Sequence, residues 1–289
     1  MKKTVLELLD RPGGRRVLGW MATIYGRRSL EGFRVFHDDD VWIHQYPGPR
    51  FMAHEKIMVP ENLAAGPEDP AYYLHADPAT FGQAIEDIGH YLPQPGDVVI
   101  DVGAGKGTLT AALAHFVGPK GTVLAVEAHP RQFRCLEAVC EYNRLEQVVL
   151  EQCAATDQET ELVIEDGGTP DENAVSTSGP GFRVPGRTLD DLIEVHELEA
   201  VDLLCMNIEG AERLAVLGMS GSIGKIRRVA IACHDFRADE EGDESMRTKD
   251  AVTAFLEQHG FAIAAADTER YGAAADDWVA ARNTALLPS

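Results

Sequence analysis

The strongest constraint on the fold is a glycine-rich turn, in which Gly103, Gly105 and Gly107 alternate between an apolar strand and a helix that begins at Thr108. The strand, residues 98–102, is mostly β-branched and apolar, which is typical of a strand buried on both faces. Glycines at such a turn allow a ligand to approach the backbone closely, beside the N-terminus of the following helix. The sequence therefore predicts a binding site for a nucleotide-like cofactor.

The spacing of these glycines separates two classes of cofactor. A dinucleotide fold has the pattern G-x-G-x-x-G, whose third glycine would fall at Thr108. The chain also lacks a Tyr-x-x-x-Lys site for hydride transfer, so a nicotinamide-dependent oxidoreductase is the weaker hypothesis. The pattern D-x-G-x-G-x-G from Asp101 to Gly107 resembles the first motif of S-adenosylmethionine-dependent methyltransferases, which implies that cofactor.

Strands and helices alternate along most of the chain, which is typical of a parallel sheet covered by helices on both faces. We expect an α/β fold with a doubly wound, mostly parallel sheet, Rossmann-like as in class I methyltransferases, with an antiparallel pair at 261–265 and 278–281. The catalytic domain is expected at 79–289, and an N-terminal extension that shapes the substrate site or a dimer contact at 1–78. The expected elements are helices 79–92, 130–144 and 248–259 and strands 98–102, 122–127, 148–154, 161–164, 201–207 and 229–233.

Charge and cysteine content exclude several kinds of partner. The net charge of −21 argues against nucleic acid and against anionic membranes. Five cysteines without a CxxC pair favour a reducing compartment over a disulfide framework, so we expect a cytoplasmic protein. No apolar run approaches the roughly 20 residues that span a bilayer.

Two regions carry weaker signals. Within the basic segment 1–35, the residues Val17, Leu18, Met21, Ile24 and Tyr25 fall on one helical face, which we expect to pack on the protein's own core. Docking on an acidic protomer, and hence a homodimer, is the alternative. The Gly/Ser/Pro-rich loop 165–183 is long for a compact domain, so it is a candidate lid over the substrate.

The carboxyl ends of the strands are expected to hold the ligands, because a doubly wound sheet binds them there. Asp101 and the glycines follow the first strand. Glu127 follows the second, where a carboxylate can accept hydrogen bonds from both ribose hydroxyls. Ala154 and Asp157 follow the third strand and are candidates for the adenine edge.

The fourth strand leads into Met206-Asn207-Ile208-Glu209-Gly210-Ala211-Glu212, and the segment from Val201 to Glu212 resembles the "iDllKiDvEGaE" motif of the FkbM family of methyltransferases. Thr188 to Leu192 is similar to that family's "tLDdl" run, Ala125 to Arg131 to its "fEPhPr" turn, and Asn143 to its helix-ending asparagine. Two positions depart from the family pattern: Cys205 replaces a lysine, and Asn207 replaces an aspartate.

The resemblance implies methyl transfer to a hydroxyl of a sugar or a secondary metabolite. An acceptor hydroxyl must lose its proton, and His234, at the end of the fifth strand, is our candidate general base, with Asp235 to orient or replace it. Asn207 joins this catalytic set, while Glu209 and Glu212 are candidates for the substrate. Alternatively, Asn207, Glu209, His234 and Asp235 could hold Mg²⁺, or the chain could be a noncatalytic cofactor-binding relative.

Overall fold

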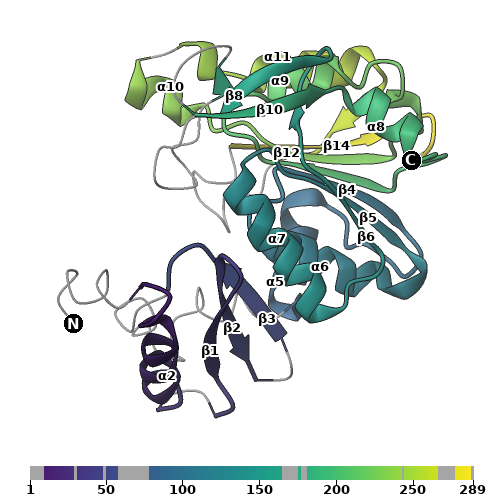
Figure 1. Ribbon diagram of the computed structural model, residues 1–289. Helices are drawn as coiled ribbons and strands as arrows, with labels where there is room; N and C mark the ends of the chain where they lie inside the picture. Colours follow the sequence, from purple (N-terminus) through teal and green to yellow (C-terminus); the bar gives the residue numbers. More distant parts are fainter. Residues whose placement is uncertain are drawn as a thin grey trace.

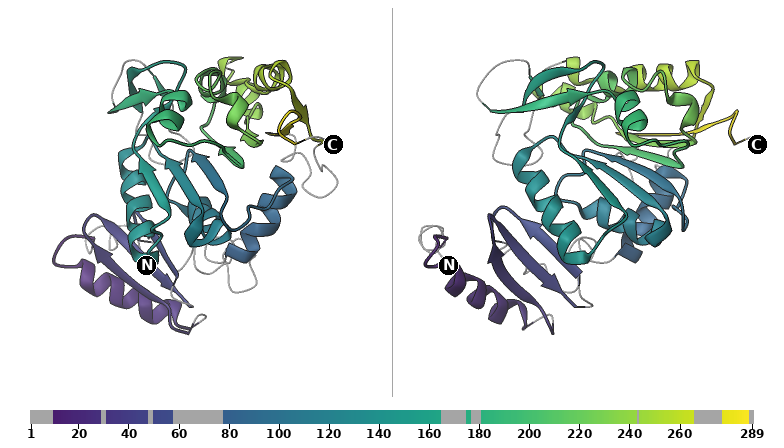
Figure 2. Two further views of the ribbon diagram at one scale, coloured as in Figure 1. Left: turned by 90° about the vertical axis from the view of Figure 1, so that its right-hand side faces the viewer. Right: turned by 45° about the vertical axis from the view of Figure 1, so that its right-hand side comes forward.

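The computed structural model describes residues 10–28, 31–47, 50–57, 78–164, 175–176, 181–242, 244–265 and 277–287. Its main body is a seven-stranded sheet with helices on both faces, and a smaller N-terminal sheet lies beside it (Figure 1, Figure 2). Within the described ranges, no helix is both long and apolar enough to cross a membrane.

The large sheet has the strand order β13-β14-β12-β11-β4-β5-β6. Five strands run parallel, and β14 pairs antiparallel with both β12 and β13. Strands β5 and β6 follow on one side of β4, whereas β11 and β12 follow on its other side. The carboxyl ends of β4 and β11 are therefore the switch point, where a doubly wound sheet binds its ligands. The expected doubly wound α/β fold is confirmed, including its antiparallel pair. The strands are β4 (Val98–Val102), β5 (Thr122–Val126), β6 (Val148–Glu151), β11 (Leu203–Met206), β12 (Arg228–Ala232), β13 (Phe261–Ile263) and β14 (Trp278–Asn283).

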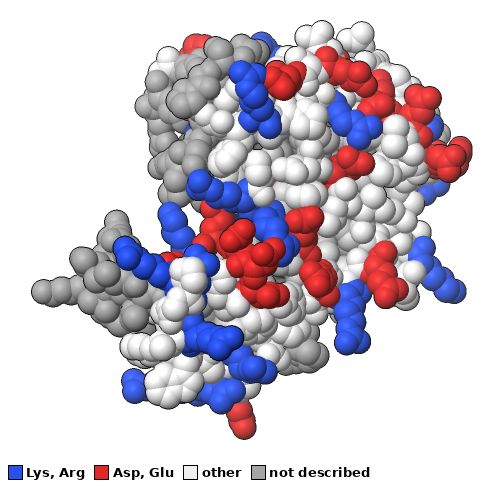
Figure 3. Space-filling model, in the orientation of Figure 1, with Lys and Arg blue, Asp and Glu red and all other residues white. Residues whose placement is uncertain are grey.

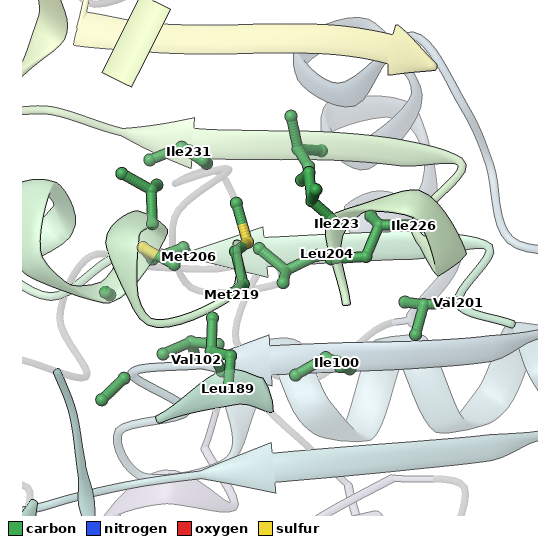
Figure 4. Close-up of a cluster of buried hydrophobic side chains, with 14 of the residues drawn as sticks. Ile100, Val102, Leu189, Val201, Leu204, Met206, Met219, Ile223, Ile226 and Ile231 are labelled. Atoms are coloured by element: carbon green, nitrogen blue, oxygen red, sulfur yellow. The ribbon is translucent and has the colours of Figure 1, made fainter. Parts of the chain in front are cut away.

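Helices cover the two faces of this sheet because alternate strand residues point to opposite sides. In β4, Val99 packs with helices α5 and α6, whereas Ile100 belongs to the cluster on the opposite face, which helices α8, α9 and α11 cover. Figure 4 shows part of that second cluster, with Ile100, Leu204 and Met219 among its members. The helices are α5 (Pro78–Gly89), α6 (Thr108–Val117), α7 (Pro130–Asn143), α8 (Leu189–Val195), α9 (Glu212–Leu217), α10 (Phe236–Glu241) and α11 (Lys249–Gln258), with 3-10 turns η1 (Gly118–Lys120), η3 (Ile223–Lys225) and η4 (Glu244–Met246).

A second, four-stranded sheet has the order β7-β10-β8-β9. The sequence indicated its strand at 161–164 but not the strand that follows the long loop. Much of the candidate lid 165–183 lies outside the described residues, which resume for this segment at 175–176 and 181. The strands are β7 (Ala154–Ala155), β8 (Thr160–Ile164), β9 (Val175–Ser176) and β10 (Phe182–Arg187).

Helix α2 (Arg15–Gly26) and strands β1 (Arg34–Asp38), β2 (Val41–Tyr46) and β3 (Arg50–His54) form what we call the N-terminal unit. Its core, which includes the fully buried Trp42, continues into Cys135 and Val139 of α7. The Asn143 side chain accepts a hydrogen bond from the Phe51 N–H and donates one to its carbonyl. The unit is therefore fixed against α7. A domain boundary between residues 78 and 79 stays a prediction.

The expected packing face of the N-terminal helix is wrong. Of the five apolar residues on that face, only Leu18 is buried, whereas Val17, Met21, Ile24 and Tyr25 are exposed. The helix packs instead through small residues: a Cβ on Gly19 would lie 2.8 Å from the Val35 carbonyl oxygen, and one on Gly26 would overlap the Phe33 ring. Close approach of a helix to a strand favours glycine, so the hydrophobic pattern pointed to the wrong side.

Candidate active site

A cavity of about 240 Å³ lies at the carboxyl ends of β4, β5 and β11. Residues from these strand ends line it together with the small strand β7 and the start of α7. The sequence-predicted residues among the lining are Gly103, Gly105, Glu127, Ala154, Asn207 and Glu209. The strand ends that were far apart in the sequence thus meet at one opening.

Gly103 and Gly105 of the glycine turn form one wall of this cavity with backbone alone, whereas Gly107 is not among the lining residues and faces Leu136 of α7. Gly103, Gly105 and Gly107 all have positive φ, at 81°, 57° and 86°. A Cβ on Gly103 would lie 2.0 Å from the Asn207 carbonyl oxygen, so the turn and the end of β11 touch through backbone. Such a turn leaves room for a flat ligand directly against the chain.

Glu127 joins the glycine turn to β5. Its Oε2 accepts a hydrogen bond from the Gly105 N–H and its Oε1 one from the His129 N–H, both at 2.7 Å. Each carboxylate oxygen has a further lone pair, so both can still accept from a ligand. Burial raises the pKa of Glu127 to about 7, against hydrogen bonds that lower it.

The other predicted cofactor residues divide into two groups. Ala154 lines the cavity, but Asp101 and Asp157 are not among its lining residues. Asp101 is buried beneath the turn and accepts a hydrogen bond from the Thr110 hydroxyl at 2.6 Å; burial raises its pKa to about 6. Asp157 is exposed and contacts the Thr156 hydroxyl. Asp101 therefore supports the turn, and neither carboxylate contacts the cavity in this structure.

A charged cluster follows β11 and β12. Glu209 lines the cavity, and its Oε2 lies 2.8 Å from Arg237 Nη1 and 3.6 Å from His234 Nδ1. His234 Nδ1 is buried and has no hydrogen-bond partner among the described residues. Both Glu209 and His234 have positive φ, at 52° and 41°. Backbone strain of this kind in non-glycine residues is found at functional sites.

The other predicted residues that follow β11 and β12 make different contacts. Asp235 Oδ1 accepts hydrogen bonds from the N–H groups of Thr248 and Lys249, at the start of α11. Glu212 is fully buried and accepts from Ile208 N–H, Gly210 N–H and the Thr248 hydroxyl. Asn207 lines the cavity, whereas neither of these carboxylates does, nor does His234, which lies beside the lining residue Glu209. In this structure Glu209, rather than Asp235, is the carboxylate beside His234.

Sequence reasoning missed three residues of the site. His129 and Gln132 line the cavity from the first turn of α7, and Arg237 pairs with Glu209 from α10. His129 stands within the turn that follows Glu127, so its place after a strand end was the signal available. Gln132 and Arg237 depend on how two helices are oriented, which no local pattern shows.

The described residues contain no group of three or more His, Cys, Asp or Glu side chains arranged to hold a metal ion. The set Asn207, Glu209, His234 and Asp235 shows why. Glu209 is paired with Arg237, and one oxygen of Asp235 holds the start of α11. Two of these four candidate ligands therefore contact other groups of the protein.

The doubly wound sheet, the glycine turn at its switch point and the acidic residue after β5 define a protein that binds a nucleoside cofactor. Residues 101–263 match the model of the methyltransferase FkbM domain. The chain belongs to this family of methyltransferases, and its cofactor is S-adenosylmethionine. The cavity suits that cofactor, because it combines a glycine wall with a carboxylate that can accept two hydroxyl groups.

Individual proteins resemble the chain over different lengths. A protein-L-isoaspartate O-methyltransferase of Aeropyrum pernix is 43% identical over 81 residues, which cover 25% of this chain and 31% of that protein. A methyltransferase FkbM from Methylobacillus flagellatus matches with a TM-score of 0.43 and 16% identity, over 71% of this chain and half of that one. Aeropyrum pernix fibrillarin, solved with S-adenosyl-L-methionine, also matches with a TM-score of 0.43 and 16% identity. The match covers 87% of this chain and 99% of that one.

Proposed function

We propose that the protein is an O-methyltransferase that methylates a hydroxyl group of a small molecule, a sugar or a secondary metabolite, with His234 as general base. The observation that carries the proposal is the position of His234. Its buried Nδ1 faces Glu209, which lines the cofactor cavity. An imidazole held beside a carboxylate is suited to accept a proton from an approaching hydroxyl.

The roles of the other residues follow from their contacts. S-adenosylmethionine supplies a methyl group already activated by its sulfonium. The glycine wall and Glu127 bind and orient the cofactor, with Ala154 on the adenine side; Asp101 supports the turn from below. Asn207 and Glu209 line the cavity, and Glu209 also lies beside His234, so both would position the acceptor. Alignment of the two reacting groups provides much of the acceleration in such displacements.

The proposal also includes the kind of partner, the oligomeric state and the location of the enzyme. The net charge of −21 supports a small-molecule acceptor over nucleic acid or an anionic membrane surface. The exposed residues Val17, Met21, Ile24 and Tyr25 of α2 support a homodimer. A cytoplasmic location fits the five cysteines, which are all buried and free.

The test is methyl transfer from radiolabelled S-adenosylmethionine to a panel of sugars and polyhydroxylated aromatic compounds. We expect His234→Ala to lower turnover by about 10²- to 10⁴-fold, the usual contribution of a general base, while cofactor affinity measured by calorimetry is unchanged. His259→Ala, at the end of α11, is the matched control and should keep wild-type turnover. Full turnover in His234→Ala, or a labelled nitrogen in place of an ether oxygen, would contradict the proposal.

A further inference from the structure

A second concave surface lies on the N-terminal unit, between α2 and β1, with a volume of about 690 Å³. We call it the arginine groove, because Arg15, Arg16, Arg27 and Arg34 line it together with Trp20 and His37. It shares no lining residue with the cofactor cavity. Its volume falls within the range of small-molecule binding sites.

The walls of the groove are fixed by close packing. Gly19 brings α2 against the Val35 carbonyl. The Thr23 hydroxyl lies 2.8 Å from the Gly19 carbonyl oxygen, where it donates, and 2.8 Å from the Val35 N–H, from which it accepts. Arg27 Nε donates to the Phe33 carbonyl at 3.0 Å, which holds that guanidinium in place. The groove is therefore formed before any ligand arrives.

The charges of the groove are largely uncompensated. Arg15 is paired with Asp10 at 2.9 Å, but Arg16 and Arg34 have no carboxylate within ion-pair distance among the residues described. This is unexpected in a chain with 47 acidic and 26 basic residues. Figure 3 shows basic side chains gathered over α2 and strands β1 to β3. Burial and, second, the charge of Arg15 lower the pKa of His37, against Asp10, Asp40 and Asp38, which raise it.

Two aromatic side chains lie beside these charges. Trp20 is 64% exposed, and Phe36 completes the lining on the side of β1. Arginine binds phosphate through two parallel hydrogen bonds, and an exposed indole stacks on planar rings. We propose that the arginine groove is a second binding site, for a phosphorylated ligand that carries a planar ring, of the kind that a nucleotide represents.

A small ligand fits these observations better than a nucleic acid does. The four arginines line a single groove of limited volume, while the whole chain carries a charge of −21 and repels a long polyanion. A ligand with two or three phosphate groups meets the four arginines without reaching the acidic surface beyond them.

The test is calorimetry with ADP on the full-length protein, with S-adenosylhomocysteine at saturation so that the cofactor cavity is occupied. We expect ADP to bind one site per chain, adenosine not to bind, and pyrophosphate to bind at least about tenfold more weakly than ADP because it lacks the ring. Trp20→Leu should lower the affinity for ADP to that for pyrophosphate. The double variant Arg16→Gln/Arg34→Gln should weaken ADP binding by about 100-fold.

Arg28→Gln is the matched control, because Arg28 follows the same helix but lies over the Tyr25 ring and outside the groove. It should leave ADP affinity within about twofold of wild type, since it removes a surface charge that does not line the groove. Three results would overturn the proposal: no ADP binding, an equal loss in Arg28→Gln and the double variant, or tight binding of single-stranded RNA without binding of ADP. None of these results depends on the proposed methyl acceptor.

Discussion

The two halves of the cofactor cavity differ in what fixes their geometry. On the side of β4 and β5, the geometry is fixed by the backbone. Three glycines there have positive φ, and a carboxylate accepts hydrogen bonds from two backbone N–H groups. On the side of β11, the geometry is fixed by charged side chains: Glu209 lines the cavity, and Arg237 and His234 contact it from behind. A cofactor shared by many enzymes can be held by backbone, whereas an acceptor particular to one enzyme needs side chains that evolution can exchange.

The largest expected effect is on the backbone side. Gly103→Ala should destabilise the protein by roughly 3–5 kcal/mol, because the new Cβ meets the Asn207 carbonyl at 2.0 Å as well as the strained φ of 81°. Gly96→Ala is the matched control, since Gly96 also has positive φ but open space around it; it should cost about 1–2 kcal/mol. Denaturant unfolding measures both. Equal losses would show that strain alone, and not contact with β11, fixes the turn.

The second effect concerns the buried carboxyl of Glu127. Its folded pKa is raised from 4.5 to about 7, so the stability that it contributes is present below pH 4.5 and is lost as the pH rises through 7. Between pH 5 and pH 8, the free energy of unfolding of Glu127→Gln without cofactor should therefore gain about 3 kcal/mol relative to wild type. A difference that stays constant with pH would contradict this origin.

The same variant should bind S-adenosylmethionine at least about tenfold more weakly at pH 8, because hydrogen bonds to a charged acceptor are replaced by weaker ones. Glu146→Gln, which changes an exposed glutamate after α7, is the control and should alter neither stability nor affinity. A variant that loses affinity while gaining relative stability shows that the cofactor side is optimised for binding.

The smallest effect lies on the side-chain half. Asp235→Ala should cost about 1–2 kcal/mol, because two N–H groups at the start of α11 lose their acceptor, and it should leave cofactor affinity unchanged. Asp250→Ala, in the first turn of the same helix, should cost about 0.5 kcal/mol or less. Thermal unfolding and calorimetry separate the two properties. Loss of cofactor affinity in Asp235→Ala would place this carboxylate nearer the cavity than its contacts do.

The contrast also explains which features could be predicted from the sequence. Alternating strands, the glycine turn and the glutamate after the second strand are local patterns, and the structure has them at Gly103, Gly105 and Glu127. The partner of His234 depends on how α10 and α11 return to the sheet, so proximity in sequence favoured Asp235 where the fold brings Glu209. The packing face of α2 could not be predicted either, since it rests on Gly19 and Gly26 and not on large apolar residues.

The Asn143 side chain has a consequence for solubility. Strand β3 lies at the edge of its three-stranded sheet, where unpaired backbone groups invite strands from other molecules. By accepting from the N–H of Phe51 and donating to its carbonyl, this one amide pairs with one residue of that edge as a neighbouring strand would. The end of α7 thus blocks strand pairing at this one point of the edge while it holds the N-terminal unit in place.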